Sequence, residues 1–236
     1  MNFRVEPYGP GALLVRFPNP AHDAAFLHAQ WLQQHFAAHP LPGLIETTPG
    51  FSTLLLEFDP ALRPSPNSLA SLLDRLPLPA LSAPPPQRVV EVPVHYDGPD
   101  LDRVAAQCGL SPQEVVTLHS APVYRVQILG FSPGFPYLAG LDPKLHVPRM
   151  ATPRPKVPAG SVAIGGEHTG IYPVATAGGW HLIGRTSLTL LDLDRAARED
   201  REAFLLHPGD GVRFVAVRTP AEQTSAEVQP QRTAPP

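Results

Sequence analysis

Cysteine is nearly absent from this 236-residue chain, which holds a single one, Cys108. An internal disulfide is therefore excluded, and Cys108, on the apolar face of a short helical pattern, is interpreted as a small core residue. Charge is also sparse, because only 17% of the residues are charged, with 18 Lys and Arg against 21 Asp and Glu. The resulting net charge of −3 supplies no field that would attract nucleic acid or an anionic membrane. We expect neither as a partner.

Long apolar runs are missing too. No stretch approaches the roughly 20 consecutive apolar residues that a membrane-spanning helix needs. The first ten residues, MNFRVEPYGP, lack the basic region and apolar core of a secretory signal peptide. Together with the lone cysteine, these absences predict a cytoplasmic protein.

Proline, by contrast, is present in excess, with 32 copies. Many of the prolines separate short apolar segments, and they predict a fold with numerous stiff turns. Hydrophobic residues make up 43% of the chain, which is the composition of a globular protein. The length allows one large domain or two modest ones.

Residues 1–77 show the same pattern twice, two alternating strands followed by a helix with one apolar face. The predicted strands span 3–9, 12–17, 43–50 and 52–58, and the predicted helices 22–38 and 68–76. This β-β-α-β-β-α order predicts an α+β N-terminal domain whose four-stranded sheet is covered on one side by two helices.

The prolines of residues 78–87 predict a semi-rigid linker to a second domain over 88–218. That domain begins with a strand and two short helices, the first ending at Gly109 and the second starting at the capping box SPQE, 111–114. The strands predicted for it span 88–96, 124–129, 160–166, 170–176, 179–186, 188–193 and 212–217. Many short strands between turns predict a mainly β barrel or sandwich. The polar tail, 219–236, is expected to be disordered.

The segment GFSPGFPY, 130–137, matches the G-x-S-x-G pattern of a serine-hydrolase nucleophile elbow. Such an elbow takes an oxyanion-hole N–H from the residue after the serine, and here that residue is Pro133, which has none. Pro136 also prevents the helix that must follow. We therefore interpret the match as a coincidence, and Ser132 as no nucleophile.

The same segment is rich in glycine and aromatic residues, including Phe131, Phe135 and Tyr137. It is predicted to be a rigid, apolar loop. Two interpretations stay open at this point, a loop folded onto the barrel and the wall of a ligand pocket.

The densest concentration of candidate site residues is PRMATPRPKVPAGSVAIGGEHTGIYP, 148–173. Arg149, Arg154 and Lys156 lie close together between prolines, and a run of glycines follows. Cations beside exposed backbone N–H groups suit phosphate or carboxylate. The alternative is that these cations pair with acids elsewhere or are solvated, and the sequence leaves both open.

Histidines supply the remaining acid–base candidates, His119, His168 and His181, since imidazole titrates near neutral pH. No phosphate loop of the form G-x-x-x-x-G-K-[ST] occurs. Any nucleotide site is therefore expected to be unconventional or shared with another chain.

Three segments carry a family resemblance: LHSAPVYRVQILGFSPGFPYLAGL, PRPKVPAGSVAIGGEHTGIYP and GGWHLIGRT. They resemble the allophanate hydrolase subunit 1 family, which contains the B subunits of bacterial ATP-dependent 5-oxoprolinases and the KipI-type inhibitors of a histidine kinase. The resemblance extends through both domains and excludes only the tail.

The resemblance implies a cyclophilin-like, mainly β-barrel C-terminal domain after the small N-terminal one. It also implies an ATP-hydrolysing enzyme whose A, B and C subunits together convert 5-oxo-L-proline to L-glutamate, the C subunit resembling the other allophanate hydrolase subunit. A chain of this kind would be inactive alone, with ATP and Mg shared with a partner subunit. The alternative within the family is an inhibitor of a histidine kinase.

The predicted catalytic residues are Arg154, Lys156 and His119. The predicted substrate- or anion-binding residues are Arg149, Gly160, Ser161, Glu167, Thr169, Tyr172, Trp180, Arg185, Phe135 and Tyr137. No metal ligand is predicted in this chain.

Overall fold

A computed structural model of the chain describes residues 3–17, 22–76, 88–198 and 200–217. The chain divides into two compact units, unit 1 up to Pro85 and unit 2 from Pro86 onward. The predicted linker at 78–87 and tail at 219–236 lie outside the described residues, and the predicted domain limits stay a prediction. In these described ranges no helix has both the length and the apolar character to cross a membrane.

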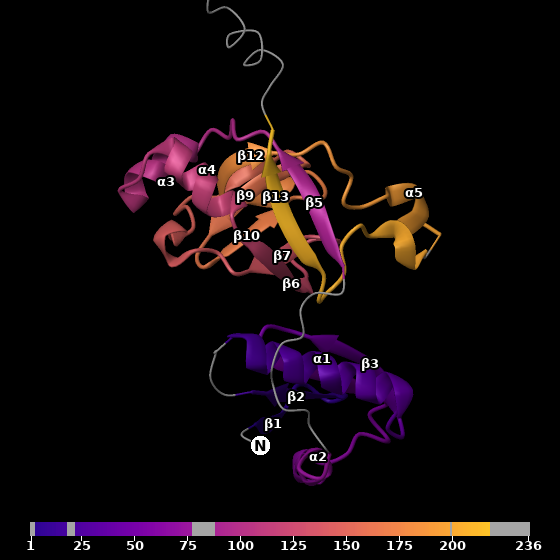
Figure 1. Ribbon diagram of the computed structural model, residues 1–236. Helices are drawn as coiled ribbons and strands as arrows, with labels where there is room; N and C mark the ends of the chain where they lie inside the picture. The colour runs from indigo at the N-terminus through magenta and orange to yellow at the C-terminus, as the bar shows by residue number, and fades with distance from the viewer. Residues whose placement is uncertain (1–2, 18–21, 77–87, 199, 218–236) are drawn as a thin grey trace, which may run out of the picture. The chain divides into compact units, whose positions relative to one another are not determined.

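Unit 1 follows the predicted β-β-α-β-β-α order (Figure 1). Its elements are β1 (Arg4–Pro7), β2 (Ala12–Arg16), α1 (His22–Ala38), β3 (Leu44–Pro49), β4 (Thr53–Phe58) and α2 (Pro66–Leu73). The strands form an antiparallel sheet in the order β1-β2-β4-β3. The second helix begins two residues before its predicted start because the Ser65 side chain caps it, accepting a hydrogen bond from the Ser68 N–H.

One face of this sheet carries the core of unit 1. Along β4, Leu54, Leu56 and Phe58 are buried and alternate with more exposed residues, as expected for a strand with one covered face. The predicted apolar face of α1 packs in the same cluster as Leu69 and Leu73 of α2. Both helices therefore cover one side of the sheet, which confirms the predicted arrangement.

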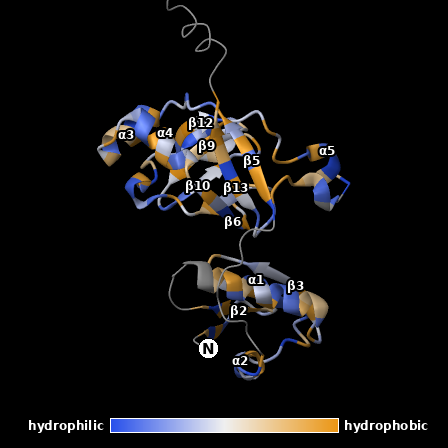
Figure 2. Cartoon of the chain, in the orientation of Figure 1, coloured by the Kyte–Doolittle hydropathy of each residue, from blue (hydrophilic) through white to orange (hydrophobic). Residues whose placement is uncertain are grey.

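Seven of the described strands of unit 2 form a barrel-like sheet in the order β12-β9-β10-β7-β6-β13-β5. Its strands are β5 (Val89–Val94), β6 (Val123–Leu129), β7 (Pro136–Ala139), β9 (Ser161–Gly165), β10 (His168–Ile171), β12 (His181–Arg185) and β13 (Gly211–Ala216). The two edges meet where His95, after β5, exchanges two backbone hydrogen bonds with Arg185 of β12. Among these pairs, β5 and β13 run parallel, and β5 is largely hydrophobic (Figure 2).

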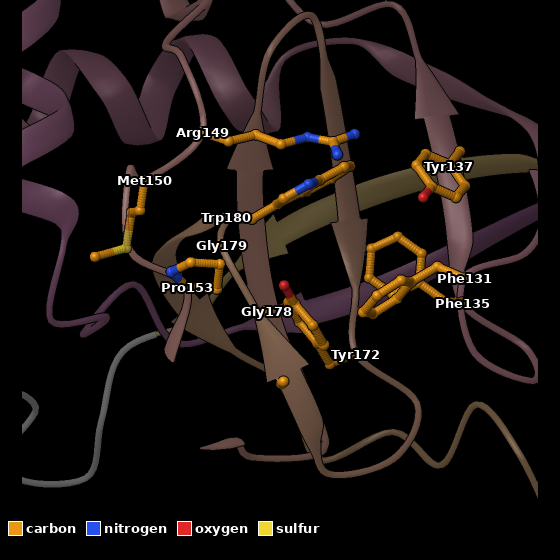
Figure 3. A pocket seen from close by; sticks show the side chains of 11 residues that line it. Phe131, Phe135, Tyr137, Arg149, Met150, Pro153, Tyr172, Gly178, Gly179 and Trp180 are labelled. Atoms are coloured by element: carbon orange, nitrogen blue, oxygen red, sulfur yellow. The ribbon is translucent and has the colours of Figure 1, made fainter. Parts of the chain in front are cut away.

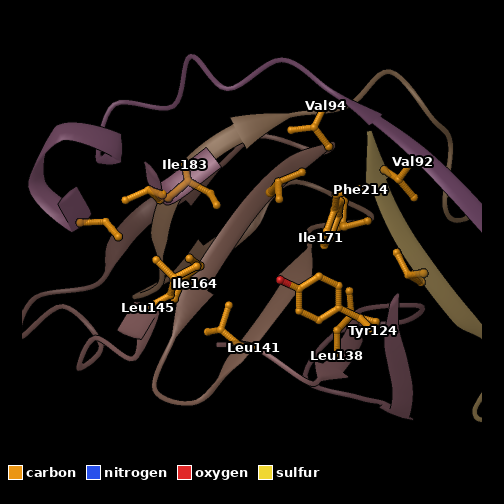
Figure 4. Packing of buried hydrophobic residues seen from close by; sticks show 14 of the residues in the cluster. Val92, Val94, Tyr124, Leu138, Leu141, Leu145, Ile164, Ile171, Ile183 and Phe214 are labelled. Atoms are coloured by element: carbon orange, nitrogen blue, oxygen red, sulfur yellow. The ribbon is translucent and has the colours of Figure 1, made fainter. Parts of the chain in front are cut away.

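The interior of the barrel-like sheet is closely packed with aliphatic and aromatic side chains, among them Tyr124, Ile164 and Phe214 (Figure 4). Helices α3 (Leu101–Cys108) and α4 (Pro112–Ser120) add Val104, Ala105 and Val115 to this core. Both predicted helix signals are confirmed. Gly109 ends α3 in the left-handed conformation, and the capping box of Ser111 and Glu114 starts α4.

A second apolar layer lies on the outer face of the same sheet. Ala163 and Leu182 alternate along their strands with interior residues, so they point away from the barrel core. They pack with Val157 of β8 (Arg154–Val157), which pairs with β11 (Thr176–Gly178) in a two-stranded ribbon. The aromatic residues of the candidate site belong to this outer layer.

Several strand assignments predicted for unit 2 differ from the structure. The run 188–193 is not a strand in the structure. Its apolar pattern reflects the burial of Leu190 and Leu191, and within this run only Leu191 forms an isolated β-bridge, to Phe204. The strand predicted over 170–176 ends at Ile171. Two strands predicted as loops, β7 and β8, contain proline at positions that tolerate it, the first residue of β7 and the two-stranded ribbon of β8. The remaining short elements are η1 (Pro143–Leu145), α5 (Leu193–Ala196) and η2 (Arg201–Ala203).

Candidate functional site

An aromatic pocket of about 330 Å³ opens on the outer face of unit 2 (Figure 3). Four separate segments line it, the loop into β7, the chain before β8, the residue after β10, and the turn between β11 and β12. The lining residues are Phe131, Phe135, Tyr137, Arg149, Met150, Pro153, Tyr172, Ala177, Gly178, Gly179 and Trp180. Five residues predicted as substrate- or anion-binding, Arg149, Phe135, Tyr137, Tyr172 and Trp180, thus come together in one pocket.

Glycines set the depth of this pocket. A Cβ on Gly165 would lie 2.6 Å from the Trp180 ring, and one on Gly178 would lie 2.2 Å from the Tyr172 hydroxyl oxygen. A Cβ on Gly170 would meet the Phe135 ring at 2.9 Å. The three aromatic rings therefore rest directly on bare backbone, which any side chain at these positions would displace.

The rings hold one another in edge-to-face contact, the geometry that aromatic quadrupoles favour. Phe135 is central, with its ring centroid 5.1 Å from that of Tyr137, 5.1 Å from that of Tyr172 and 5.4 Å from that of Trp180. Burial raises the pKa of the Tyr172 hydroxyl, and a hydrogen bond from the Trp180 backbone N–H opposes that shift. Tyr172 therefore stays a neutral phenol at physiological pH.

Phe131, at the rim of the pocket, has an unusual backbone. Its φ of +67° is the one positive value among the described residues other than glycine. The Ser132 N–H donates to the Gly130 carbonyl at 2.8 Å, closing a γ-turn around Phe131. A bulky residue held there costs on the order of 1–3 kcal/mol. The ring is nevertheless 62% exposed, so burial within the chain does not offset this cost.

Ser132, beside it, has no nucleophilic geometry. Its hydroxyl oxygen is buried and lacks a hydrogen-bond partner among the described residues. The following segment forms strand β7 rather than the helix that a nucleophile elbow requires. The structure thus agrees with the interpretation of G-x-S-x-G as a coincidence.

Arg149 supplies the charge of the aromatic pocket. Its guanidinium carbon lies 5.6 Å from the centroid of the Trp180 ring, a cation–π contact. Figure 3 shows its side chain extended along Trp180 towards the side of Tyr137. Within the described part of the chain no carboxylate pairs with Arg149, and no acidic residue lines the pocket. The guanidinium is therefore available to an anionic ligand.

A second cavity, the cationic groove of about 380 Å³, lies next to the aromatic pocket. Its lining residues are Asp97, Gly98, Pro99, Arg154, Lys156, Pro158, Ala159, Ser161, Leu182, Gly184 and Arg185. Arg154 connects the two cavities, because its guanidinium contacts the Met150 sulfur and the Trp180 carbonyl of the aromatic pocket. The predicted cation cluster is thus divided, with Arg149 in the pocket and the other two cations in the groove.

Two of the three groove cations are paired with acids. Arg154 donates to Asp100 at 2.7 Å, and this carboxylate, 3% exposed, also accepts from the Leu182 backbone N–H at 2.7 Å. Arg185 pairs with Asp97 at 2.7 Å in a more exposed bridge. Lys156 is exposed and forms no ion pair with any described residue. Its ammonium group can therefore bind an anionic ligand without first breaking an ion pair within the described residues.

His119 lies in neither cavity. It is fully buried, stacks on Phe214 at 4.5 Å, and bonds Tyr96 through Nδ1 and Thr169 through Nε2, both at 2.8 Å. Because the Thr169 hydroxyl donates to the Ala163 carbonyl, Nε2 carries the hydrogen and Nδ1 accepts from Tyr96. Burial lowers the pKa of His119 to about 3. Full burial with both ring nitrogens bonded is typical of a structural histidine, and no observation tests the predicted catalytic role, which stays a prediction.

The other predicted site residues are dispersed. Ser161 lines the groove, with its hydroxyl donated to the Pro158 carbonyl. Gly160 directly precedes Ser161 and has a φ of +79°. A side chain at this position would clash with the Thr186 carbonyl oxygen, so the position favours glycine. Thr169 belongs to the buried His119 network, and Glu167 lies exposed between β9 and β10, in the lining of neither cavity.

The sequence does not reveal two acids of the candidate site, Asp97 and Asp100, which pair with the groove arginines. Each lies more than 50 positions from its partner, so no local pattern reveals the pairing. The sequence predicts Phe131 only as part of an aromatic loop, since its backbone conformation has no signature in the sequence.

Known proteins are similar to this chain in sequence and, for a solved structure, in fold. The family model of the carboxyltransferase domain, subdomain C and D, matches residues 3–199. The 5-oxoprolinase B subunit of Escherichia coli O157:H7 is 50% identical over 182 residues, which cover 74% of this chain and 79% of that protein. The 5-oxoprolinase B subunit of Bacillus subtilis (strain 168) is 36% identical over 232 residues, 92% of this chain and 94% of that protein.

A solved structure, that of TTHA0988, superposes with a TM-score of 0.74 at 42% identity. The match covers 89% of this chain but only 40% of TTHA0988, so this chain corresponds to less than half of that longer protein.

Proposed function

The chain belongs to the carboxyltransferase subdomain C and D family and to its branch of 5-oxoprolinase B subunits, and we propose that it is the B subunit of an ATP-dependent 5-oxoprolinase. The observation that carries this proposal is the 36% identity to a 5-oxoprolinase B subunit over 92% of this chain. A B subunit is part of a multi-subunit enzyme. We propose the A and C subunits as its partners, in the cytoplasm, and a cyclophilin-like topology for unit 2.

The proposed reaction opens the five-membered lactam of 5-oxo-L-proline to give L-glutamate. Resonance makes the amide resistant to water. ATP transfers its γ-phosphoryl group to the carbonyl oxygen and leaves as ADP; water then adds to the activated carbon and the ring C–N bond breaks, and a second water releases inorganic phosphate to give L-glutamate. The protein must then hold a carboxylate-bearing ring and stabilise the negative charge that moves between phosphate and lactam oxygens. The two adjacent cavities offer cations for both tasks.

The residues of this chain fit only part of an ATP site. The sequence lacks a phosphate loop, and no group of three His, Cys, Asp or Glu side chains able to hold a metal occurs among the described residues. The cationic groove nevertheless presents the Lys156 ammonium beside the glycine turn at Gly160. We propose that Lys156 contacts the transferring phosphate, while the remainder of the site, with its Mg, comes from a partner subunit.

The groove cations have different proposed roles because their surroundings differ. Lys156 is a mobile point charge without an acid partner in the described residues, which suits a group that follows a moving phosphate. Arg154 is held by Asp100, so we propose that it fixes the wall between groove and pocket. Its predicted catalytic role depends on whether a ligand displaces that bond.

Reconstitution tests the proposed function. The chain is mixed with the A and C subunits encoded by its own genome, and ADP and glutamate are measured with and without 5-oxo-L-proline. The proposal expects substrate-dependent formation of both products only when this chain is present. Unchanged activity after the chain is omitted, or no activity of the complete mixture, refutes it. Lys156→Ala tests the groove within the same assay.

A further inference from the structure

The size and aromatic lining of the pocket favour a small, flat ligand. Three of its rings, those of Trp180, Tyr172 and Phe135, lie against glycine backbone and border the open space of the pocket, here called the slot. Its volume of about 330 Å³ is at the small end of the range for ligand pockets, roughly 300–1,000 Å³. A planar ring fills such a slot through stacking and edge contacts, whereas a flexible chain would lose conformational entropy on entering.

The charge of the pocket favours a single anionic group. Arg149 is the one ionised side chain among the described lining residues, and the Trp180 face holds its guanidinium by a cation–π contact. A carboxylate would gain a charge-assisted and potentially bidentate hydrogen bond there. An ammonium group would find no carboxylate in the described lining. The pocket therefore selects for a monoanion over a zwitterion.

Phe131 adds an independent observation. Its strained γ-turn would be relieved by glycine, and the residue is 62% exposed, so burial within the chain does not offset the strain. The ring lies at the rim of the slot and makes edge-to-face contacts. Its centroid is 5.6 Å from that of Phe135 and 6.5 Å from that of Tyr172. The position is explained if the ring packs on whatever occupies the slot.

We propose that the aromatic pocket binds the ring of the lactam substrate, a planar cyclic amide with one carboxylate. Arg149 receives the carboxylate, and Phe131 covers the ring as a specificity-determining residue. This inference rests on the proposed function for the identity of the substrate. It goes further because it places the substrate ring in the aromatic pocket and the phosphate in the cationic groove, with Arg154 forming the wall between the two cavities.

The first test measures kcat and KM for 5-oxo-L-proline in the reconstituted complex. Arg149→Gln removes the charge and keeps a polar amide on a shorter side chain, and it is expected to raise KM by about 10- to 100-fold. Phe131→Gly is expected to raise KM about threefold to tenfold while the melting temperature of the chain stays equal or rises. The matched control is Arg213→Gln, at an exposed cation on β13 outside both cavities, which should leave KM unchanged.

A second test measures binding to the chain without its partners. The sequence contains two tryptophans, so a Trp31→Phe background reports Trp180 alone. 5-Oxo-L-proline should change this fluorescence in a saturable way, and the change should weaken strongly in Arg149→Gln. L-proline, a zwitterion, and 2-pyrrolidone, which lacks the carboxylate, should bind at least tenfold more weakly.

The outcomes separate this inference from the proposed function. An active complex whose KM is unaffected by both Arg149→Gln and Phe131→Gly overturns the pocket assignment and leaves the function standing. An inactive complex together with Arg149-dependent binding to the chain refutes the function and supports the site. Loss of stability in Phe131→Gly without a change in KM shows a purely structural ring and overturns its assigned role.

Discussion

The ion pair between Arg154 and Asp100 should be the most sensitive electrostatic contact in unit 2. Asp100 has two donors, the Arg154 guanidinium and the Leu182 N–H, and its side chain is 4% exposed against 25% for Arg154. Asp100→Ala leaves both donors without an acceptor in a largely buried setting. Breaking such a pair by removing one partner costs about 3–5 kcal/mol.

The same groove contains its own control. Asp97 pairs with Arg185 at the same N–O distance, 2.7 Å, but the two side chains are 41% and 65% exposed. Asp97→Ala should therefore cost at most about 1 kcal/mol. Both substitutions remove a carboxylate that pairs with an arginine. Asp100 is far less exposed to solvent and also accepts from the Leu182 N–H, whereas the bonds of Asp97 are to Arg185.

The assay is urea unfolding followed by Trp180 fluorescence in the Trp31→Phe background, which reports unit 2. With an m-value of about 2 kcal/mol/M, the midpoint should fall by about 1.5–2.5 M for Asp100→Ala and by less than about 0.5 M for Asp97→Ala. The double variant Asp100→Ala/Arg154→Ala should recover part of the loss, since no guanidinium is then left unpaired. Equal midpoints for the two single variants would refute the reasoning.

Three further predictions concern other parts of unit 2. Burial lowers the pKa of His119 from 6.5 to about 3. Between pH 7 and pH 5 this histidine therefore becomes protonated in the unfolded chain but stays neutral in the folded chain. The free energy of unfolding falls by roughly 2 kcal/mol as a result. The urea midpoint should therefore drop less in His119→Gln than in the wild type, and an equal drop would contradict the burial argument. Gly165→Ala, which drives a Cβ into the Trp180 ring at 2.6 Å, should cost about 1–3 kcal/mol in thermal unfolding. Gly130→Ala, whose Cβ would meet nothing closer than 3.9 Å, should be nearly neutral by comparison. Lys156→Ala should lower kcat of the reconstituted complex by about 100-fold or more, with stability within about 0.5 kcal/mol, and wild-type turnover would remove Lys156 from the reaction.

Local signals in the sequence predicted local structure well. The helix at 22–38, the stop at Gly109 and the capping box at 111–114 depend on residues a few positions apart, and all three are present. The strands β7 and β8 were missed because proline suggested loops, although a strand start and a two-stranded ribbon both accept it.

The site was predictable in composition but not in arrangement. Arg154 and Lys156, two apart on β8, share one side of that strand and line one groove, whereas Arg149 precedes the strand and reaches the aromatic pocket instead. The acid that holds Arg154 is 54 positions away. Likewise, the burial of His119 depends on Tyr96 and Thr169, which only the folded sheet brings to it.

The most direct measurement is a crystal structure of the reconstituted complex with 5-oxo-L-proline bound. We expect the lactam ring to lie in the slot between Trp180, Tyr172 and Phe131, with its carboxylate on the Arg149 guanidinium. A substrate held wholly by partner subunits, with this pocket open to solvent, would contradict this expectation.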